Sequence, residues 1–172
     1  RAAGIRAPVL LLEGFFEADE LPLIIEHDFW CVVHSLWQLE AIEQAKLSKP
    51  LTLWLKLDSG MHRVGLHPKD YHEAYQRLLA SGKVAKIVLM SHFARADELD
   101  CVRSNEQVAV FEAARQGLSA EVSLRNSPSV MGWPNVSSDW VRPGIMLYGA
   151  TPFGKDQAIA ARLQPVMTLE SK

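Results

Sequence analysis

The chain has 172 residues, enough for one domain with a sizeable core, and its formal net charge is −2 with 22% charged residues. Because Lys and Arg are spread along the chain without a basic block, neither nucleic acid nor a membrane is an expected partner. The two cysteines are too few for a disulfide framework and no stretch resembles a transmembrane span or a signal peptide, so we expect a cytoplasmic protein.

Apolar runs and helical spacings alternate along most of the chain. In order, they predict a strand at 9–12, a helix at 19–27, a strand at 29–33, a helix at 35–47, a strand at 51–57, a helix at 68–81, a strand at 84–90, a helix at 104–117 and a strand at 121–124. Two of these helices begin at sequences with the spacing of a capping box, Ser35 to Gln38 and Ser104 to Gln107.

The two ends of the chain are less regular. Residues 1–4 resemble the end of a helix whose start is missing, which suggests a piece of a longer protein. After the strand at 121–124, a loop with a short helical turn leads to Arg142 and an apolar run at 145–148, and residues 164–172 resemble one further strand. With six βα-like units and short connections, the sequence predicts an α/β fold in which helices cover a parallel sheet.

Lys56 is the anomalous residue of the central strand. It lies one residue from the end of a run made of Leu, Thr and Trp that is apolar on both faces, as in a strand buried within a parallel sheet. A buried ammonium is costly unless it is paired, neutralised or chemically altered. The simpler interpretation is that Lys56 reaches solvent past the strand end or pairs with an acid such as Asp58.

Polar residues gather where the expected strands end. They are Glu13, His34, Lys56, Asp58, His92, Asn126, Ser127, Arg142 and Gly144. Because the ends of parallel strands lie on one side of a sheet, we expect these groups to line one site, as in barrels and doubly wound sheets. Any one of them is more often a cap or a satisfied loop group, but together they favour a functional site.

Several other kinds of site lack support in the sequence. There is no GxGxxG and no P-loop, so dinucleotide binding or ATP hydrolysis of those types is not expected. The six His residues show no HxH, HExxH or Cys/His ligand spacing, and we therefore expect no metal site.

The strand-end segments resemble those of bacterial alanine racemases. The matching segments are LLLEGFFEADEL at 10–21, LKLDSGMHRVG at 55–65, MSHFARAD at 90–97, SLRNSP at 123–128 and DWVRPGIMLYG at 139–149. They follow the order and spacing of that family along essentially the whole chain, and are most similar to its catabolic branch in proteobacteria. The resemblance implies an incomplete (β/α)8 TIM barrel at 1–155 that holds the cofactor, then a linker and the first strand of a β-rich C-terminal domain at 156–172.

The resemblance also implies a reaction. Enzymes of this family are homodimers that interconvert L-alanine and D-alanine by removing and returning the Cα proton on an imine of pyridoxal 5'-phosphate. The family's Schiff-base lysine and its tyrosine partner match no position of this chain. The piece alone is therefore expected to be inactive.

Individual residues acquire roles through the same resemblance. Lys56 matches a lysine that is carbamylated, and Arg63 matches an arginine near the phenolic oxygen of the cofactor and the substrate carboxylate. His92 matches a residue that packs beside a Tyr and Arg network, and Arg142 matches the arginine that donates to the pyridine nitrogen. The positions that match the phosphate-binding residues are Asn126, Ser127, Gly144 and Ile145.

Three alternatives remain open. A non-catalytic pyridoxal phosphate carrier would share the phosphate residues but has little need for a Lys56–Arg63 pair. A decarboxylase on the same barrel would place an acidic residue at the position of Arg142. A metal-dependent hydrolase can use a carbamylated lysine to bridge two ions, but it needs several His ligands at strand ends.

Overall fold

One parallel sheet of five strands forms the centre of the molecule. The computed structural model describes residues 2–154, 158–166, 168 and 170. The strands are β1 (Val9–Leu11), β2 (Phe29–Val33), β3 (Leu51–Lys56), β4 (Val84–Met90) and β5 (Glu121–Ser123). Each strand pairs in parallel with the next one in the chain, so the order in the sheet is β1-β2-β3-β4-β5. This is the connectivity of a (β/α)8 barrel, and the predicted partial barrel is confirmed.

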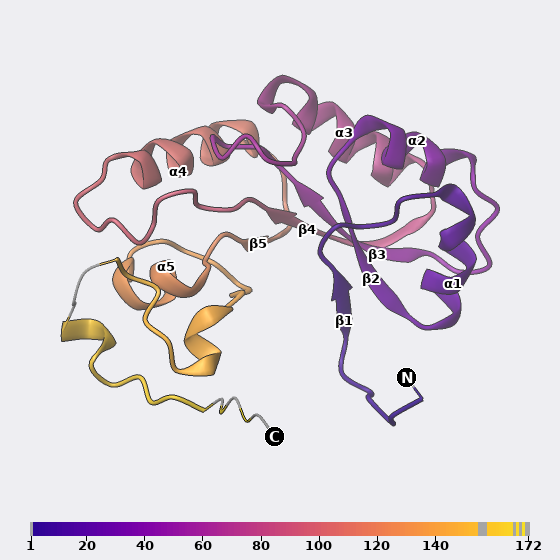
Figure 1. Ribbon diagram of the computed structural model, residues 1–172. Helices are drawn as coiled ribbons and strands as arrows, with labels where there is room; N and C mark the ends of the chain where they lie inside the picture. Colours follow the sequence, from indigo (N-terminus) through magenta and orange to yellow (C-terminus); the bar gives the residue numbers. More distant parts are fainter. Residues whose placement is uncertain (1, 155–157, 167, 169, 171–172) are drawn as a thin grey trace.

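Helices connect the strands or follow the last one. They are α1 (Leu21–Glu26), α2 (Leu36–Gln44), α3 (Pro68–Ala80), α4 (Arg103–Ala114) and α5 (Ser127–Gly132), with 3-10 helices η1 (Ala18–Glu20), η2 (Ile145–Tyr148) and η3 (Ala158–Ala160). The helices α1 to α4 connect the strands and pack their buried residues into one core with the sheet, whereas α5, η2 and η3 follow the last strand. In Figure 1, α2, α3 and α4 follow the same side of the curved sheet. On α3, residues at helical spacing are buried, among them Tyr71, whose hydroxyl donates to the Leu55 carbonyl of β3 at 2.8 Å.

The strands carry apolar side chains on both faces of the sheet. Successive side chains of a strand point to opposite faces, so neighbouring residues belong to different clusters. On β3, Leu53 and Leu55 belong to the large core shared with the helices, whereas Trp54 between them belongs to a second cluster. In that cluster Trp30, Trp54 and Trp140 pack together with ring centroids 5.4 to 6.3 Å apart. The remaining members of the second cluster are Leu10, Val32, Val88 and Met90.

Both predicted capping boxes are wrong. Ser35 precedes α2, which ends earlier than expected, but its hydroxyl forms no hydrogen bond with the part of the chain that the structure describes. Ser104 lies inside α4, and its hydroxyl likewise has no partner among the described residues. The side chains of Gln38 and Gln107 turn instead toward the loops that follow the strands.

The sixth expected unit forms no strand. Beside β5 there is a single isolated parallel bridge, between Asn126 and Arg142. Pro143 follows directly and has no N–H to extend a ladder, and the apolar run beyond it coils into η2. The apolar run at 145–148 is therefore helical, and Arg142 remains next to the end of β5.

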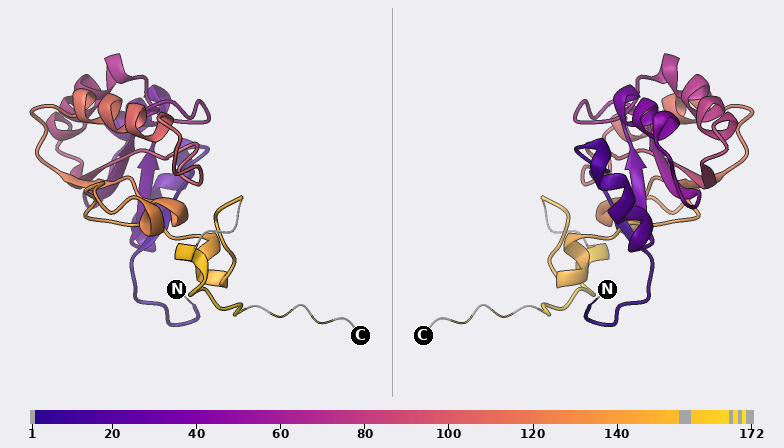
Figure 2. Two further views of the ribbon diagram at one scale, coloured as in Figure 1. Left: turned by 90° about the vertical axis from the view of Figure 1, so that its left-hand side faces the viewer. Right: turned by 90° about the vertical axis from the view of Figure 1, so that its right-hand side faces the viewer.

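The last part of the chain lies outside the sheet. Of the strand expected at 164–172, residues 167, 169, 171 and 172 lie outside the described residues, and the others are in no strand. Figure 2 shows the segments 2–8 and 158–166 at the same end of the molecule. The expected domain boundary between residues 155 and 156 also falls outside the described residues and stays a prediction.

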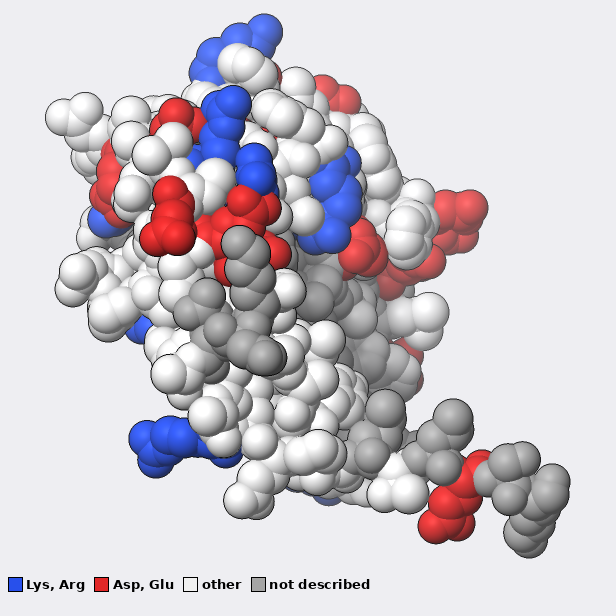
Figure 3. Space-filling view, turned by 60° about the vertical axis from the view of Figure 1, so that its left-hand side comes forward, with Lys and Arg blue, Asp and Glu red and all other residues white. Residues whose placement is uncertain are grey.

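Charges of both signs share the surface. On the face shown in Figure 3, Lys and Arg side chains lie among Asp and Glu side chains. Ion pairs form between neighbouring elements, for example between Arg77 of α3 and Glu43 of α2 at 2.7 Å. In the described part of the chain, no helix combines the length and the hydropathy needed to cross a membrane.

Candidate functional site

The carboxyl ends of β3, β4 and β5 meet at one edge of the sheet. Lys56 at the end of β3 is level with Met90 at the end of β4, and Met90 is level with Ser123 of β5. The pairing continues past the strand ends, since the Ser91 N–H donates to the Ser123 carbonyl at 3.2 Å. The loops that carry most of the expected site residues therefore begin side by side, as the sequence predicts.

Arg142 lies across the ends of β4 and β5. Its Nη1 donates to the carbonyl of Ser123 at 2.9 Å and also to the Ser123 hydroxyl, and its Nη2 donates to the Ser91 carbonyl at 2.6 Å. Burial lowers the pKa of this guanidinium to about 10, which still leaves it protonated at neutral pH. It forms no ion pair with any residue that the structure describes, and its Nε–H has no partner there either.

His92 follows β4 and lies between two donors. Its Nδ1 is 3.5 Å from Arg142 Nη2, and its Nε2 is 3.4 Å from Asn126 Nδ2. A neutral imidazole accepts at only one nitrogen, so one of these contacts is a hydrogen bond in a given tautomer. Burial, together with the positive charges of Arg142, Arg63 and Lys56, lowers the pKa of His92 to about 4. The imidazole is therefore neutral at physiological pH.

Lys56 is a buried amine without a partner among the described residues. Only 6% of the residue is exposed, and its Nζ forms no hydrogen bond or ion pair within the described part of the chain. Burial lowers the pKa of Lys56, as do the charges of Arg63 and Arg142, and two carboxylates partly offset this. The simpler interpretation of Lys56, with its ammonium in solvent or on Asp58, is not supported.

Asp58 instead holds the turn that follows β3. Its Oδ1 accepts from three successive backbone N–H groups, those of Gly60, Met61 and His62, at 3.0 Å each. These bonds and the nearby His62 lower the pKa of Asp58, although its burial opposes them. Arg63 comes next in this turn, exposed and without a hydrogen bond to any described residue. Its guanidinium is thus available to a ligand.

The expected phosphate residues lie together beyond β5. Asn126 caps α5 in a capping box with Ser129, which the sequence analysis did not identify. The buried Ser127 hydroxyl accepts from the Gly144 N–H at 2.7 Å, and the N–H of Ile145 has no partner among the described residues. The Ser127 hydroxyl proton and the Ile145 N–H, beside Arg142, are donors that suit an oxyanion, while the Gly144 N–H is bonded to Ser127 Oγ.

Glu13 and His34, two of the strand-end residues, contact each other. The His34 ring is 3.1 Å from the carbonyl of Glu13, so these two residues join the loops after β1 and β2 to each other. Only the Glu13 carboxylate acts on the site, as one of the charges that favour a protonated Lys56.

The chain matches a known protein family over most of its length. Residues 1–152 match the family model described as "Alanine racemase, N-terminal domain". The chain belongs to this family. It is 86% identical over all 172 residues to the alanine racemase of Pseudomonas fluorescens and 71% identical to the catabolic alanine racemase of Pseudomonas aeruginosa. The chain spans 48% of the length of each of these curated relatives.

The fold gives the same result. The crystal structure of the biosynthetic alanine racemase from Pseudomonas aeruginosa matches with a TM-score of 0.89 and 41% identity, over 96% of this chain and 46% of that one. Within the described residues, no group of three or more His, Cys, Asp and Glu side chains is placed to hold a metal ion.

Sequence reasoning missed several residues that support this site. Ser91 and Ser123 supply the carbonyls that hold Arg142. Ser91 directly follows the apolar run at 84–90, so the strand-end rule is sufficient to find it, whereas Ser123 lies within the strand expected at 121–124. Ser59 and Gln107 join the loops after β3 and β4. The spacing of Gln107 had only suggested a helix cap, because its partners are distant in the sequence.

Proposed function

We propose that this chain is the cofactor-binding part of an alanine racemase that uses pyridoxal 5'-phosphate to interconvert L-alanine and D-alanine. The proposal is carried by the contacts of Arg142, a partly buried guanidinium that has no acidic partner in the described chain and whose Nε–H is free. That group fits a neutral, accepting ring nitrogen. An arginine keeps its own proton and leaves such a nitrogen unprotonated. A decarboxylase of this barrel type would instead present a carboxylate there.

The remaining donors fit the phosphate of the cofactor. Beyond β5 lie the Ser127 hydroxyl, which accepts from the Gly144 N–H, and the Ile145 N–H, which has no partner among the described residues, while Asn126 fixes the start of α5. Arg142 precedes Gly144 by two residues, so one short segment supplies a donor for the ring and donors for the phosphate. When bound, the cofactor supplies an electron-withdrawing ring that acidifies the Cα proton of alanine.

Lys56 and Arg63 have a joint role in the proposal. The lowered pKa of Lys56 increases the fraction of neutral amine, whose nitrogen bonds to the carbon of carbon dioxide and releases one proton to solvent. The resulting carbamate is an anion among Arg63, Arg142 and the neutral His92. It would hold the Arg63 guanidinium toward the carboxylate of alanine, which a carrier protein would not require.

The complete enzyme needs residues beyond this chain. Two residues remove and return the Cα proton of alanine, namely the lysine that also binds the cofactor and a tyrosine. Both come from the rest of a longer, homodimeric protein. A catabolic role is supported by the comparison within one species, because identity is 71% to the catabolic enzyme of Pseudomonas aeruginosa and 41% to its biosynthetic one.

Racemisation in deuterated water by the longer protein tests the proposal. L-alanine should give D-alanine, and solvent deuterium should appear at Cα. Replacing Arg142 with Leu should reduce the rate by about 100-fold or more, as for loss of a charged donor at a reacting group. A folded, cofactor-loaded wild-type protein that forms no D-alanine would rule the proposal out.

A further inference from the structure

Two buried glutamines join the loops at the strand ends. Gln38 of α2 accepts from the His34 N–H at 2.9 Å and donates to the Phe15 carbonyl at 3.0 Å, which joins the loops after β2 and β1. Gln107 of α4 accepts from the Ala94 N–H at 2.9 Å in the loop after β4. Both side chains are almost fully buried, with 0% and 3% exposed, so each makes the same kind of tertiary contact in place of a helix cap.

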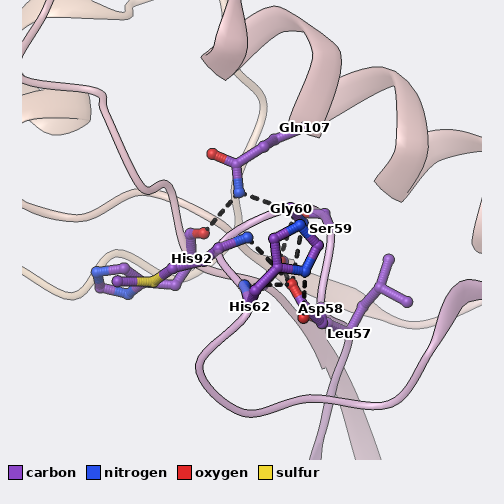
Figure 4. Close-up of polar contacts among 9 residues, drawn as sticks. Leu57, Asp58, Ser59, Gly60, His62, His92 and Gln107 are labelled. Carbon is purple, nitrogen blue, oxygen red and sulfur yellow. Dashed lines mark hydrogen bonds and ion pairs between the residues drawn. The ribbon is translucent and has the colours of Figure 1, made fainter.

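Gln107 differs from Gln38 in the loops that it reaches. Its Nε2 donates to the His92 carbonyl at 2.9 Å and to the Ser59 hydroxyl at 3.3 Å. Figure 4 shows its side chain extending from α4 to the backbone of His92 and to the turn at Ser59 and Gly60. One amide therefore bonds both the residue that touches Arg142 and the turn that carries Arg63.

A directed chain of hydrogen bonds starts at this amide. The Ser59 and Ser91 hydroxyls are 2.7 Å apart, and the Ser91 hydroxyl donates to the Leu57 carbonyl at 2.9 Å. Because Ser91 uses its proton on Leu57, Ser59 must donate to Ser91, and Ser59 in turn accepts from Gln107. The chain ends at the Leu57 carbonyl, and the backbone carbonyl of Ser91, one of its members, accepts separately from Arg142. All the hydroxyl protons in the chain thus have assigned partners.

We propose that Gln107 is a positioning residue, which fixes the turn of Arg63 and the loop of His92 relative to each other and to Arg142. This inference rests on the proposed function, since it is that function that gives Arg63, His92 and Arg142 their roles. Gln107 itself points away from the reacting groups, toward backbone and hydroxyl partners. Its removal should therefore act on the geometry of the site rather than on its composition.

Gln107→Met in the full-length, cofactor-loaded protein tests this role. Methionine has a similar volume, so the core stays filled while all three hydrogen bonds disappear. Hydrogen–deuterium exchange of peptides covering 57–65 and 91–97 should become about fivefold to tenfold faster. At 91–97 the Ala94 amide loses its acceptor, and at 57–65 the turn loses the bond between Gln107 and Ser59. The turnover number for alanine should fall by about tenfold or more, since small displacements of catalytic groups are costly.

Gln38→Met is the matched control. It removes the same chemistry from an equally buried site, and should speed exchange at 13–16 and at His34 while leaving 91–97 unchanged. Equal exchange at 91–97 in both variants, or a turnover number that is as high in Gln107→Met as in Gln38→Met, would overturn the proposal.

A smaller change keeps the proposal testable if Gln107→Met does not fold. Ser59→Ala removes one step of the hydrogen-bond chain, and should speed exchange at 57–65 with little effect at 91–97, where Gln107 still bonds His92. Unchanged exchange at 57–65 would contradict the inference. If the wild-type protein itself forms no D-alanine, the proposed function fails, and the exchange pattern alone then decides the role of Gln107.

Discussion

Arg142, Lys56 and His92 show how one group at the site changes the others. The Arg142 guanidinium donates hydrogen bonds to backbone carbonyls rather than to a carboxylate, so its charge is not neutralised by any described side chain. Burial lowers the pKa of both Lys56 and His92, and the charges of Arg63 and Arg142 act in the same direction. The site therefore favours neutral forms of its own titratable groups and attracts an anionic ligand.

His92 should make stability depend on pH. In the folded protein its pKa is about 4, against 6.5 for an ordinary histidine, because of burial and nearby cations. As pH falls below about 6.5, the unfolded chain takes up a proton that the folded protein does not, so stability is lost down to about pH 4. The loss from His92 should reach about 2 kcal/mol near pH 5.

Urea unfolding of the full-length protein at about pH 7.5 and about pH 5 measures this effect. His92→Gln should remove the His92 contribution and show the smaller fall in the free energy of unfolding. His72→Gln, at an exposed residue of α3, is the control and should retain the full fall. Equal falls in the His92 variant and the wild type would mean that the imidazole is solvated.

The residues of the site differ in how far sequence reveals them. Lys56 was noticed because a cation interrupts an apolar strand, and His92 because it follows a strand end. The hydroxyl and amide partners Ser59 and Gln107 carry no such local signal, since their bonds join residues 48 positions apart. Their placement depends on the packing of α4 against the sheet.

The turn after β3 is the element on which Arg63 depends. Gly65 closes this turn with a φ of +143°, and a Cβ there would lie 2.5 Å from the Asp58 nitrogen and 2.7 Å from the Leu57 carbonyl carbon. Both are backbone atoms paired to the sheet, so neither can move aside. Glycine is required at this position for steric and conformational reasons together.

Gly65→Ala should therefore be strongly destabilising. Gly82, which follows α3, also has a positive φ of +68° but has open space around it. Gly82→Ala should cost about 1 kcal/mol from the backbone alone, and Gly65→Ala more than twice that. Denaturant unfolding of the two variants of the full-length protein gives the comparison, and equal costs would show that the turn adapts.

Elements were predictable where burial alone decides them. β2 and β4 have the bounds that their apolar runs indicate, because a strand buried on both faces leaves little choice of register. The helices expected to start at Ser35 and Ser104 begin within one residue of those positions, but the two capping boxes are absent, since their glutamines bond loops instead. The capping box at Asn126 was hidden by the proline that follows Ser127.

The whole molecule is a partial barrel, and the helices α1 to α4 cover only one face of its sheet. Among the described residues, β1 pairs only with β2 and β5 only with β4. The tryptophan cluster lies on the side away from the large core and the helices. Unpaired strand edges and an uncovered apolar face promote association.

Residues 1–172 produced alone should therefore associate. We expect early, broad elution in size-exclusion chromatography and strong binding of a hydrophobic dye, compared with the longer protein. A monomeric peak with cooperative thermal unfolding would show that this piece is self-sufficient.

The central claim is that the ends of β3, β4 and β5 hold pyridoxal phosphate, with Arg142 at the ring. A crystal structure of the longer protein loaded with the cofactor tests it most directly. We predict that the ring nitrogen accepts a hydrogen bond from Arg142 and that the phosphate contacts Ser127, Gly144 and Ile145. A phosphate bound elsewhere, or a ring nitrogen facing a carboxylate, would contradict the account.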